Sequence, residues 1–469
     1  MPAFEREIIV MSDWSRGYPV DSAYFDTMQP EISPFRWRPA LLTARISGPS
    51  TRRFRFLELG CGSAHTLIAL AACYPEAEFL GIDFMPEHVV RARALIAEIG
   101  LTNIRVEEAG FADLAAQRPE DRFDYAAMHG VWSWVDAETR GDIVALLGGW
   151  LAPGALVYNG YNCAAGWAAA APIRQIFREA PAGAGAGDTR YAAAREAVAA
   201  WLSYAQNPAL DALWQRLSKQ SDAFLAHELG AAHGSAVWFT DLAEALEPAK
   251  LGFGCPCELH EQFDALFLDG ARLDLIRRGS EQGWGQTARD LSYNRTFRAD
   301  LFHRGALRLT TSEMIAELRA LRVLGWSREA GFGLLADLPV KDTPVATPEI
   351  EARVAELAAD GAHPIGEIVD GLDLDPQRAL QTVLVQLIKG NLMAVRDEAE
   401  VAAARDGTRA FNTVAKHHLE AGRRILPGLV SPDTGGVVIV PKTLQRAGFG
   451  LESGDPAQID RMQALGLTL

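Results

Sequence analysis

The sequence has few cysteines, no surplus of basic residues and no long hydrophobic run. Its 469 residues include only five cysteines, an odd number that is too small for a disulfide framework. Lysine and arginine total 45 against 60 acidic residues, a formal net charge of −15, and such a surface repels phosphate backbones. No stretch approaches the roughly 18 apolar residues of a membrane span, and the acidic N-terminus is not that of a signal peptide. We therefore expect a cytoplasmic protein that binds neither nucleic acid nor membrane.

The cysteines also argue against a metal centre. Cys255 and Cys257 are separated by a single proline, and no second close pair is present to complete a zinc-type ligand set. We expect structural thiols and no metal.

What is present indicates a folded protein of several domains. Hydrophobic residues make up 49% and charged residues 22%, which is typical of globular proteins, and the length suggests two or more domains. Pro339, Pro344 and Pro348 lie within ten residues of one another. This cluster predicts a linker.

Strand and helix patterns alternate five times in the first third of the chain. Short apolar runs predict buried strands, and apolar residues at helical spacing predict the helices between them. Predicted strands are 54–59, 79–82, 104–106, 123–128 and 155–158, and predicted helices are 64–74, 86–99 and one starting after Asp136. This alternation predicts an α/β fold with a doubly wound, Rossmann-like parallel sheet.

Four segments follow from these patterns. Residues 1–163 form the core with an N-terminal lid, and 164–235 form a helical insertion that could dimerise or bind substrate. Residues 236–338 hold a further helix and two strands, near 251–259 and 297–301, that could return to the sheet. Residues 349–469 form a mainly helical, winged-helix-like domain, which in so acidic a chain favours packing or protein binding over DNA.

The residues that indicate a function are a glycine-containing turn and an acidic residue at the end of the next strand. Glu58-Leu59-Gly60-Cys61-Gly62 lies between a strand and a helix, and Asp83 follows at the end of the next strand. Glycines let the backbone approach a ligand, and a carboxylate at the second strand tip can accept both hydroxyls of a ribose. This arrangement predicts a nucleoside-containing cofactor.

Two differences from the nicotinamide-binding motif indicate which class of cofactor is bound. A nicotinamide fingerprint requires a third glycine where this chain has His65. The strand ends in Glu58, which suits a ligand carrying an amino group better than a pyrophosphate. Both features favour S-adenosylmethionine.

The motifs FLELGCGSAHTL and FLGIDFMPEHV, with GFADL at 110–114 and LAPGALVYNGYN at 151–162, resemble class I S-adenosylmethionine-dependent methyltransferases. GYPVDSAYF, HGVWSWV, YNGYNCAAGW and FLAHELG further resemble bacterial methyltransferases that carry a methyltransferase regulatory domain, a group that includes the rickettsial protein-lysine methyltransferases. The chain lacks the Asn-Pro-Pro-Tyr motif of amide- and base-methylating enzymes after the fourth strand.

The resemblance implies a role for each matched residue. Glu58, Gly60, Cys61 and Gly62 would surround the methionine part of the cofactor, and Asp83 would bind the ribose. The remaining residues implied in cofactor binding are Phe84 and Met85 beside the adenine, Ala112 and Asp113 near its amine, and His129 and Gly130 facing the sulfonium.

The acceptor is less constrained. His129, Tyr161, Tyr18 and Tyr24 are the candidates for orienting it, together with Asn162, while Trp132 and Trp134 could either line its pocket or fill the core. The resemblance favours the lysine amine of a protein or peptide, which must lose its proton before it can attack. The alternatives are O-methylation of a small molecule or peptide carboxylate, and a regulator that binds S-adenosylmethionine without turnover.

Overall fold

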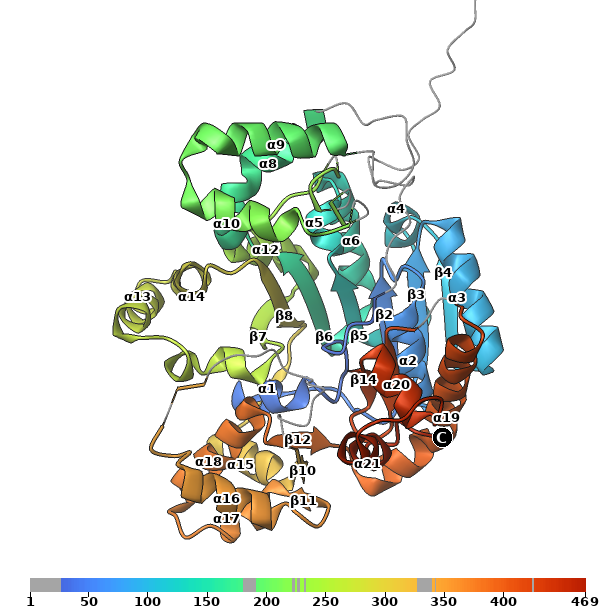
Figure 1. Ribbon diagram of the computed structural model, residues 1–469, viewed down its shortest axis with the longest axis vertical. Coiled ribbons are helices and arrows are strands. Elements are labelled where there is room, and N and C mark those ends of the chain that lie inside the picture. Colours follow the sequence, from blue (N-terminus) through green and yellow to red (C-terminus); the bar gives the residue numbers. More distant parts are fainter. Residues whose placement is uncertain are drawn as a thin grey trace, which may run out of the picture.

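The protein is built around one mixed sheet of seven strands (Figure 1). The structure is a computed structural model that describes residues 27–179, 191–221, 224–225, 228–231, 233–326, 340–341, 343–423 and 426–469. The strand order is β4-β3-β2-β5-β6-β8-β7. In that order the strands span Ile104–Glu108, Glu78–Asp83, Arg55–Leu59, Phe123–His129, Leu151–Asn162, Phe297–His303 and Gly252–Pro256.

The predicted alternation of strands and helices is confirmed, with one difference in direction. Strands β2 to β6 are parallel, whereas β8 runs antiparallel to both of its neighbours, β6 and β7. The chain leaves β7 and passes through the antiparallel hairpin of α13 (Gly270–Glu281) and α14 (Gly285–Tyr293). Because this hairpin returns the chain to the edge that it left, β8 begins beside the end of β6, where Phe297 pairs with Asn162.

Each face of the sheet has its own hydrophobic core because successive strand residues point to opposite sides. Phe56 belongs to one core and Leu57 to the other. The first core lies under α1, α2 and α3, and the second lies under α4, α5, α6 and α12. On the first face, α1 spans Arg38–Thr43, α2 spans His65–Cys73 and α3 spans Pro86–Ile99. On the second face, α4 spans Phe111–Ala115, α5 spans Val131–Trp134, α6 spans Ala137–Trp150 and α12 spans Phe239–Leu246.

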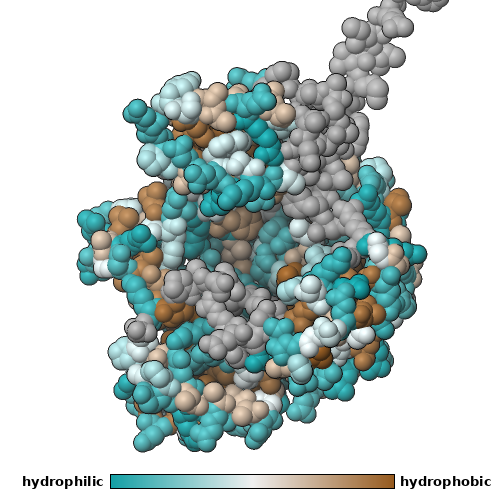
Figure 2. Space-filling model, in the orientation of Figure 1, coloured by the Kyte–Doolittle hydropathy of each residue, from teal (hydrophilic) through white to brown (hydrophobic). Residues whose placement is uncertain are grey.

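The expected helical insertion forms a small bundle with a separate core. Its helices are α7 (Ala164–Trp167), α8 (Ala171–Glu179), α9 (Ala192–Ala205) and α10 (Pro208–Leu217). The bundle lies above the carboxyl ends of the central strands in Figure 1. The surface view in Figure 2 shows a hollow between this bundle and the region below it.

The helices and strand predicted after the proline cluster are also present. They are α16 (Pro348–Leu357), α17 (Ile365–Asp370), α18 (Pro376–Lys389) and β12 (Leu392–Val395). The small sheet of this unit has the order β11-β10-β12, with β11 at Ala362–Pro364. Its central strand β10 (Arg322–Gly325), with α15 (Thr311–Ala320) before it, precedes the proline cluster. The unit is therefore completed by chain from the preceding segment.

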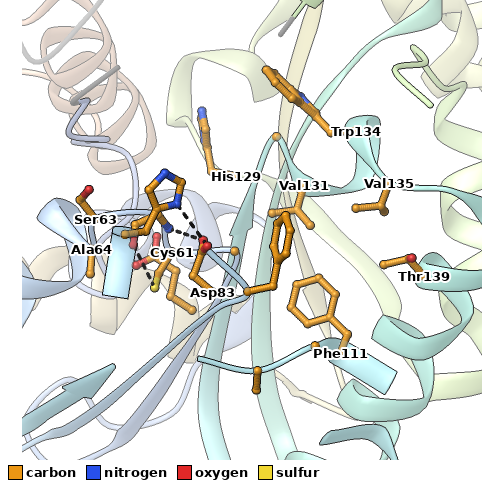
Figure 3. Close-up of a pocket in the computed structure, with 18 of the residues that line it drawn as sticks. Cys61, Ser63, Ala64, Asp83, Phe111, His129, Val131, Trp134, Val135 and Thr139 are labelled. Carbon is orange, nitrogen blue, oxygen red and sulfur yellow. Dashed lines mark hydrogen bonds and ion pairs between the residues drawn. The ribbon is translucent and has the colours of Figure 1, made fainter. Parts of the chain in front are cut away.

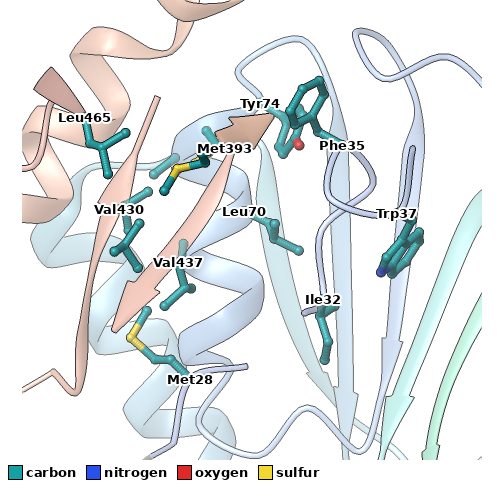
Figure 4. Close-up of a cluster of buried hydrophobic side chains, with 14 of the residues drawn as sticks. Met28, Ile32, Phe35, Trp37, Leu70, Tyr74, Met393, Val430, Val437 and Leu465 are labelled. Atoms are coloured by element: carbon teal, nitrogen blue, oxygen red, sulfur yellow. The ribbon is translucent and has the colours of Figure 1, made fainter. Parts of the chain in front are cut away.

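The last part of the chain packs against the central domain. Helix α19 (Glu398–Glu420) lies along α2, and the hairpin of β13 (Gly428–Ser431) and β14 (Gly436–Ile439) covers the same helix. Figure 4 shows the hairpin strands that carry Val430 and Val437 beside α2, which carries Leu70. Helices α20 (Lys442–Gly448) and α21 (Pro456–Ala464) follow, and β1 (Ile46–Ser47) pairs with β9 (Leu307–Arg308). One hydrophobic core thus includes residues from both ends of the described chain.

No helix in the described ranges combines the length and the apolar character that a membrane crossing requires.

Candidate active site

The glycine turn after β2 is held against the neighbouring strand. The amides of Gly60 and Cys61 both donate to the carbonyl of Ile82, at 2.8 and 3.0 Å. Gly60 and Gly62 have positive φ values of 66° and 55°, which glycine adopts at little cost. A Cβ on Gly60 would lie 2.5 Å from Val131 Cγ2, whereas a Cβ on Gly62 would meet no atom of the described residues within 4 Å. The turn therefore has one glycine packed against the protein and one facing open space.

Asp83, at the end of β3, is the hydrogen-bonding centre of this turn. Its Oδ2 accepts from the amide of Gly62 at 2.8 Å, and its Oδ1 accepts from the amide of Met85 at 2.9 Å. Its Oδ1 also lies 3.2 Å from Nδ1 of His88. These contacts hold the carboxylate at the junction of two strand–helix turns, and open α/β sheets bind their ligands at the carboxyl ends of such strands.

Glu58 is a buried carboxylate without a complete set of partners. It is 6% exposed, and among the residues that the structure describes its Oε2 has no hydrogen-bond partner. Burial, with the negative charge of Asp83 adding to it, raises the pKa of the Glu58 carboxyl to about 8. A buried carboxylate in this state favours a cationic ligand group, because such a group would replace the lost hydration.

These groups line a cavity of about 440 Å³ at the carboxyl ends of the strands (Figure 3). Every residue predicted to bind the cofactor lies in its wall except Met85, which contributes its backbone amide to Asp83. In Figure 3, Ser63 and Ala64 lie on one side of Asp83, and an apolar group lies on the other. That group comprises Phe111, Val131, Val135 and Trp134, with Thr139 beside it.

Of this apolar side, the sequence analysis names only Trp134. Val131 and Trp134 belong to the short helix α5 after β5, and Val135 and Thr139 flank the start of α6. The Asp136 cap was recognised, and its side chain does accept from the amide of Thr139 at 2.7 Å. The signal available was that both helices begin at the carboxyl edge of the sheet, beside the predicted ligand.

The two tryptophans have different roles. Trp132 is 2% exposed and packs in the core under α5, while Trp134 lines the cavity. They are two positions apart on one short helix, so their side chains point in different directions.

Tyr161 does not reach the cavity wall, contrary to the expectation that it orients the acceptor. It is fully buried, and its hydroxyl donates to Asp300 Oδ2 at 2.7 Å. Asp300 in turn accepts from the buried guanidinium of Arg298. Strand alternation directs the Tyr161 side chain into the second core, on the face of the sheet opposite to Tyr158, which belongs to the first core.

Other acceptor candidates have separate outcomes. Tyr18 and Tyr24 lie outside the described residues. Asn162 is buried and its side-chain amide donates to Glu228 Oε2 at 2.9 Å, so it joins β6 to the helical insertion.

His129 does line the cavity, and it belongs to a group that the sequence did not reveal. Its Nδ1 lies 2.9 Å from the hydroxyl of Tyr158 and 3.7 Å from Oε1 of Glu31. Burial lowers the pKa of His129 below its ordinary value of 6.5, although Glu31 acts in the opposite direction. The imidazole is therefore neutral at physiological pH.

The cavity fits S-adenosylmethionine on its own chemistry. The unsatisfied Glu58 oxygen suits the amino group of the methionine part, and Gly62 leaves space where a side chain would obstruct a ligand. Asp83 suits the ribose hydroxyls, and the apolar side suits a flat base. Fold and site together define a class I methyltransferase.

Comparison with known proteins gives the same class. A family model described as "Methyltransferase domain" matches residues 57–157, and one described as "Predicted methyltransferase regulatory domain" matches residues 221–304. The second match spans α12, β7, α13, α14 and β8. The chain is an S-adenosylmethionine-dependent methyltransferase of class I that carries a methyltransferase regulatory domain.

Individual relatives extend the similarity along the chain. An uncharacterized protein of Synechocystis is 27% identical over 427 residues, which cover 86% of this chain and 81% of that protein. An uncharacterized protein of Rickettsia prowazekii is 26% identical over 46% of this chain and 40% of its own length. The structure of PKMT2 from Rickettsia typhi in complex with AdoHcy superposes with a TM-score of 0.63 at 17% identity, covering 93% of this chain and 90% of that one. The shared fold therefore includes the C-terminal region.

Proposed function

We propose that this methyltransferase transfers the methyl group to an amine of a protein or peptide, with a lysine side chain as the acceptor. The observation that carries methyl transfer is the cavity formed by Glu58, Gly62 and Asp83. The lysine assignment is supported by the motif resemblance to rickettsial protein-lysine methyltransferases and by the fold shared with PKMT2. The formal charge of −15 also favours encounter with a cationic segment.

The roles proposed for the cofactor-binding residues follow the geometry. Glu58 and the amides around Gly60 and Gly62 hold the amino-acid part, and Asp83 holds the ribose. Phe84 and Met85 flank the base, and Ala112 and Asp113 lie at its edge. His129 and Gly130 are the residues of the wall proposed to lie nearest the transferred methyl.

The cofactor supplies an activated methyl group, so the chain mainly positions the reactants and excludes water. An ammonium has no lone pair with which to attack. A lysine acceptor must therefore be desolvated or must give its proton to a group of the protein before transfer.

A second acceptor class has some support. Trans-aconitate 2-methyltransferase of Methylobacterium nodulans is 31% identical to this chain, but the match covers only 27% of the chain. A carboxylate acceptor is already ionised near neutral pH and would need no base. The product itself separates the two classes.

The decisive experiment is transfer of isotopically labelled methyl groups from S-adenosylmethionine to two acceptor pools, the proteome of the source organism and its small-molecule extract. Mass spectrometry then locates the label. Label on lysine side chains that falls strongly with the Asp83→Ala variant at subsaturating S-adenosylmethionine supports the proposal. Label found only on carboxylates or hydroxyls contradicts it.

A further inference from the structure

The short helix α5 is the part of the cavity wall that connects the glycine turn after β2 with the helical insertion. Val131 and Trp134 of α5 line the cavity beside His129 (Figure 3). Val131 packs on the turn, where it would clash with any side chain at Gly60. The indole of Trp134 lies over Gly130, because a Cβ there would be 3.4 Å from Trp134 Nε1. With only four residues, α5 is too short to be stable by itself, so contacts with other elements must set its position.

A buried serine of α5 makes two of these contacts. Ser133 is fully buried, and its hydroxyl accepts from the amide of Asn162, the last residue of β6, at 2.8 Å. Its carbonyl accepts from the amide of Ser235 at 2.8 Å. Arg140 of α6 adds a third link, because it donates to the carbonyl of Trp132 at 2.9 Å and to the Ser235 hydroxyl at 2.7 Å. Helix α5 is thus joined to the end of the helical insertion.

Asn162 extends this group of hydrogen bonds into the insertion. Its side-chain amide donates to Glu228 Oε2 at 2.9 Å, and its carbonyl accepts from the amide of Val237 at 2.9 Å. The backbone carbonyl of Glu228 accepts from Nε and Nη2 of Arg174 in α8, at 2.9 and 2.7 Å. The guanidinium of Arg174 also lies 5.5 Å from the ring centre of Trp167 in α7. A continuous path of contacts therefore runs from α7 and α8 through Glu228 and Asn162 to α5.

The polar character of this path makes it specific for one arrangement. Ser133 is fully buried and Asn162 is 6% exposed, and a buried polar group that loses its partner costs free energy. Burial raises the pKa of Glu228, whereas the hydrogen bond from Asn162 and the charge of Arg174 act in the opposite direction. A satisfied buried network of this kind fixes the elements that it joins more precisely than apolar contacts do.

We propose that Glu228, Asn162 and Ser133 are positioning residues through which the helical insertion sets the place of Trp134 in the cavity wall. The inference rests on the proposed place of the transferred methyl beside His129, and it holds for an amine or a carboxylate acceptor. Methyl transfer needs the acceptor and the methyl in line and in close contact, so a displaced wall slows it. The carboxylates proposed to hold the amino-acid part and the ribose belong to β2 and β3, outside this path. The path should therefore affect the rate of transfer more than cofactor affinity.

The place of Trp134 is tested by fluorine-19 NMR of the full-length protein labelled with 5-fluorotryptophan and bound to S-adenosylhomocysteine. The Trp134 signal is assigned from Trp134→Phe. Glu228→Leu removes the acceptor for the Asn162 side chain and should shift or broaden this signal, whereas Glu228→Gln keeps an acceptor oxygen and should restore it. The matched control is Val198→Ala, which weakens the core of the same insertion and should leave the signal unchanged. An unchanged signal in Glu228→Leu overturns the proposal.

The effect on transfer is measured with labelled S-adenosylmethionine at saturation and the acceptor pool that the wild type labels. Glu228→Leu should lower the rate by on the order of 10- to 100-fold, while the Kd of S-adenosylmethionine, measured by calorimetry, stays close to the wild-type value. Ser133→Ala removes the acceptor of the Asn162 amide at the other end of the path and should have the same effects. Glu228→Gln should restore most of the rate. Rates of Glu228→Leu and Ser133→Ala that match the wild type overturn the proposal.

The outcomes separate this inference from the proposed function. A loss of cofactor affinity as large as the loss of rate shows general damage to the site and overturns the positioning role, whichever acceptor carries the label. An equal loss of rate in Glu228→Gln and Glu228→Leu shows that the hydrogen bond is not what acts, and it also overturns the inference. Label found only on carboxylates contradicts the lysine acceptor, and the comparison of the Glu228 variants still tests the positioning role.

Discussion

At the scale of single residues, the site depends on two carboxylates with different surroundings. Asp83 accepts from two backbone amides and lies beside His88, so its charge is already stabilised. Glu58 is buried with an unsatisfied oxygen. The carboxylate of Asp83 is therefore a fixed hydrogen-bond acceptor, whereas the carboxylate of Glu58 would be stabilised by a cationic ligand group.

We predict that Asp83→Ala weakens S-adenosylmethionine binding by about 30–150-fold, because a charged hydrogen-bond acceptor contributes roughly 2–3 kcal/mol. Isothermal titration calorimetry measures this. Asp241→Ala, an exposed aspartate in the first turn of α12, serves as the control and should bind normally. Unchanged affinity in Asp83→Ala would remove Asp83 from the cofactor site.

A second prediction concerns pH and Glu58. Its folded-state pKa is raised from 4.5 to about 8. Its contribution to stability is therefore present below pH 4.5 and is lost progressively as the pH rises to about 8. The free energy of unfolding of the ligand-free wild type should fall over this range relative to Glu58→Gln, as measured by urea denaturation.

Cofactor affinity should change in the opposite direction, since the ligand's amino group favours the ionised carboxylate. Wild-type affinity should increase with pH up to about 8 relative to Glu58→Gln. Ionisation of the ligand itself affects both proteins equally. Parallel affinity curves for the two proteins would show that Glu58 does not contact a cationic group.

At the scale of elements, the contact between α2 and α19 joins the C-terminal region to the methyltransferase sheet. Gly407 of α19 makes this contact possible, because a Cβ there would lie 2.4 Å from the backbone oxygen of Ala72 in α2. The helix that begins at the cofactor turn is thus covered on its outer side by a helix more than 300 residues later in the sequence.

We predict that Gly407→Ala lowers the free energy of unfolding by about 1–3 kcal/mol, because the helices must separate. Gly141→Ala is the matched control. Gly141 also lies inside a helix, α6, but a Cβ there meets no atom within 4 Å. This control should be neutral or stabilising by up to about 1 kcal/mol through helix propensity. Thermal unfolding of both variants measures the difference in stability, and equal stability of the two variants would contradict the close packing of α2 and α19.

At the scale of the whole molecule, the chain after the proline cluster completes structure that precedes it. Strand β10 pairs with β12, its partner beyond the cluster, through residues 322–325 and 392–395. The largest hydrophobic core includes Leu70 of the methyltransferase sheet region and Val437 of the C-terminal hairpin. The linker predicted at residues 339–348 stays a prediction.

We predict that a chain ending at residue 340 loses cooperative folding, because one face of α2 and both edges of β10 become exposed to water. Circular dichroism melting and dye binding measure this. Full-length protein cleaved by protease within the proline cluster is the control, and its two fragments should remain associated in size-exclusion chromatography. A shortened chain that melts cooperatively and binds S-adenosylmethionine normally would show that the C-terminal region is dispensable for folding.

The Rossmann-like alternation, the glycine turn after β2 and the acidic residue at the end of β3 can be predicted from the sequence, because they depend on local signals. Apolar periodicity and glycine at positive φ are properties of a few consecutive residues. Gly60, Gly62 and Asp83 could be recognised for that reason. The strands at 79–82, 104–106, 123–128 and 155–158 and the helices at 64–74 and 86–99 are predicted on the same basis.

Which residues far apart in the chain come into contact depends on how the elements pack. Glu31, His129 and Tyr158 are separated by about 100 and 29 positions, and nothing local in any of them indicates the other two. Strand parity, which depends on register, placed Tyr158 in the first core and Tyr161 in the second. The direction of β8 and the cover that α19 gives to α2 likewise depend on long-range packing. Local patterns determine elements, whereas a site assembled from several elements exists only after they pack.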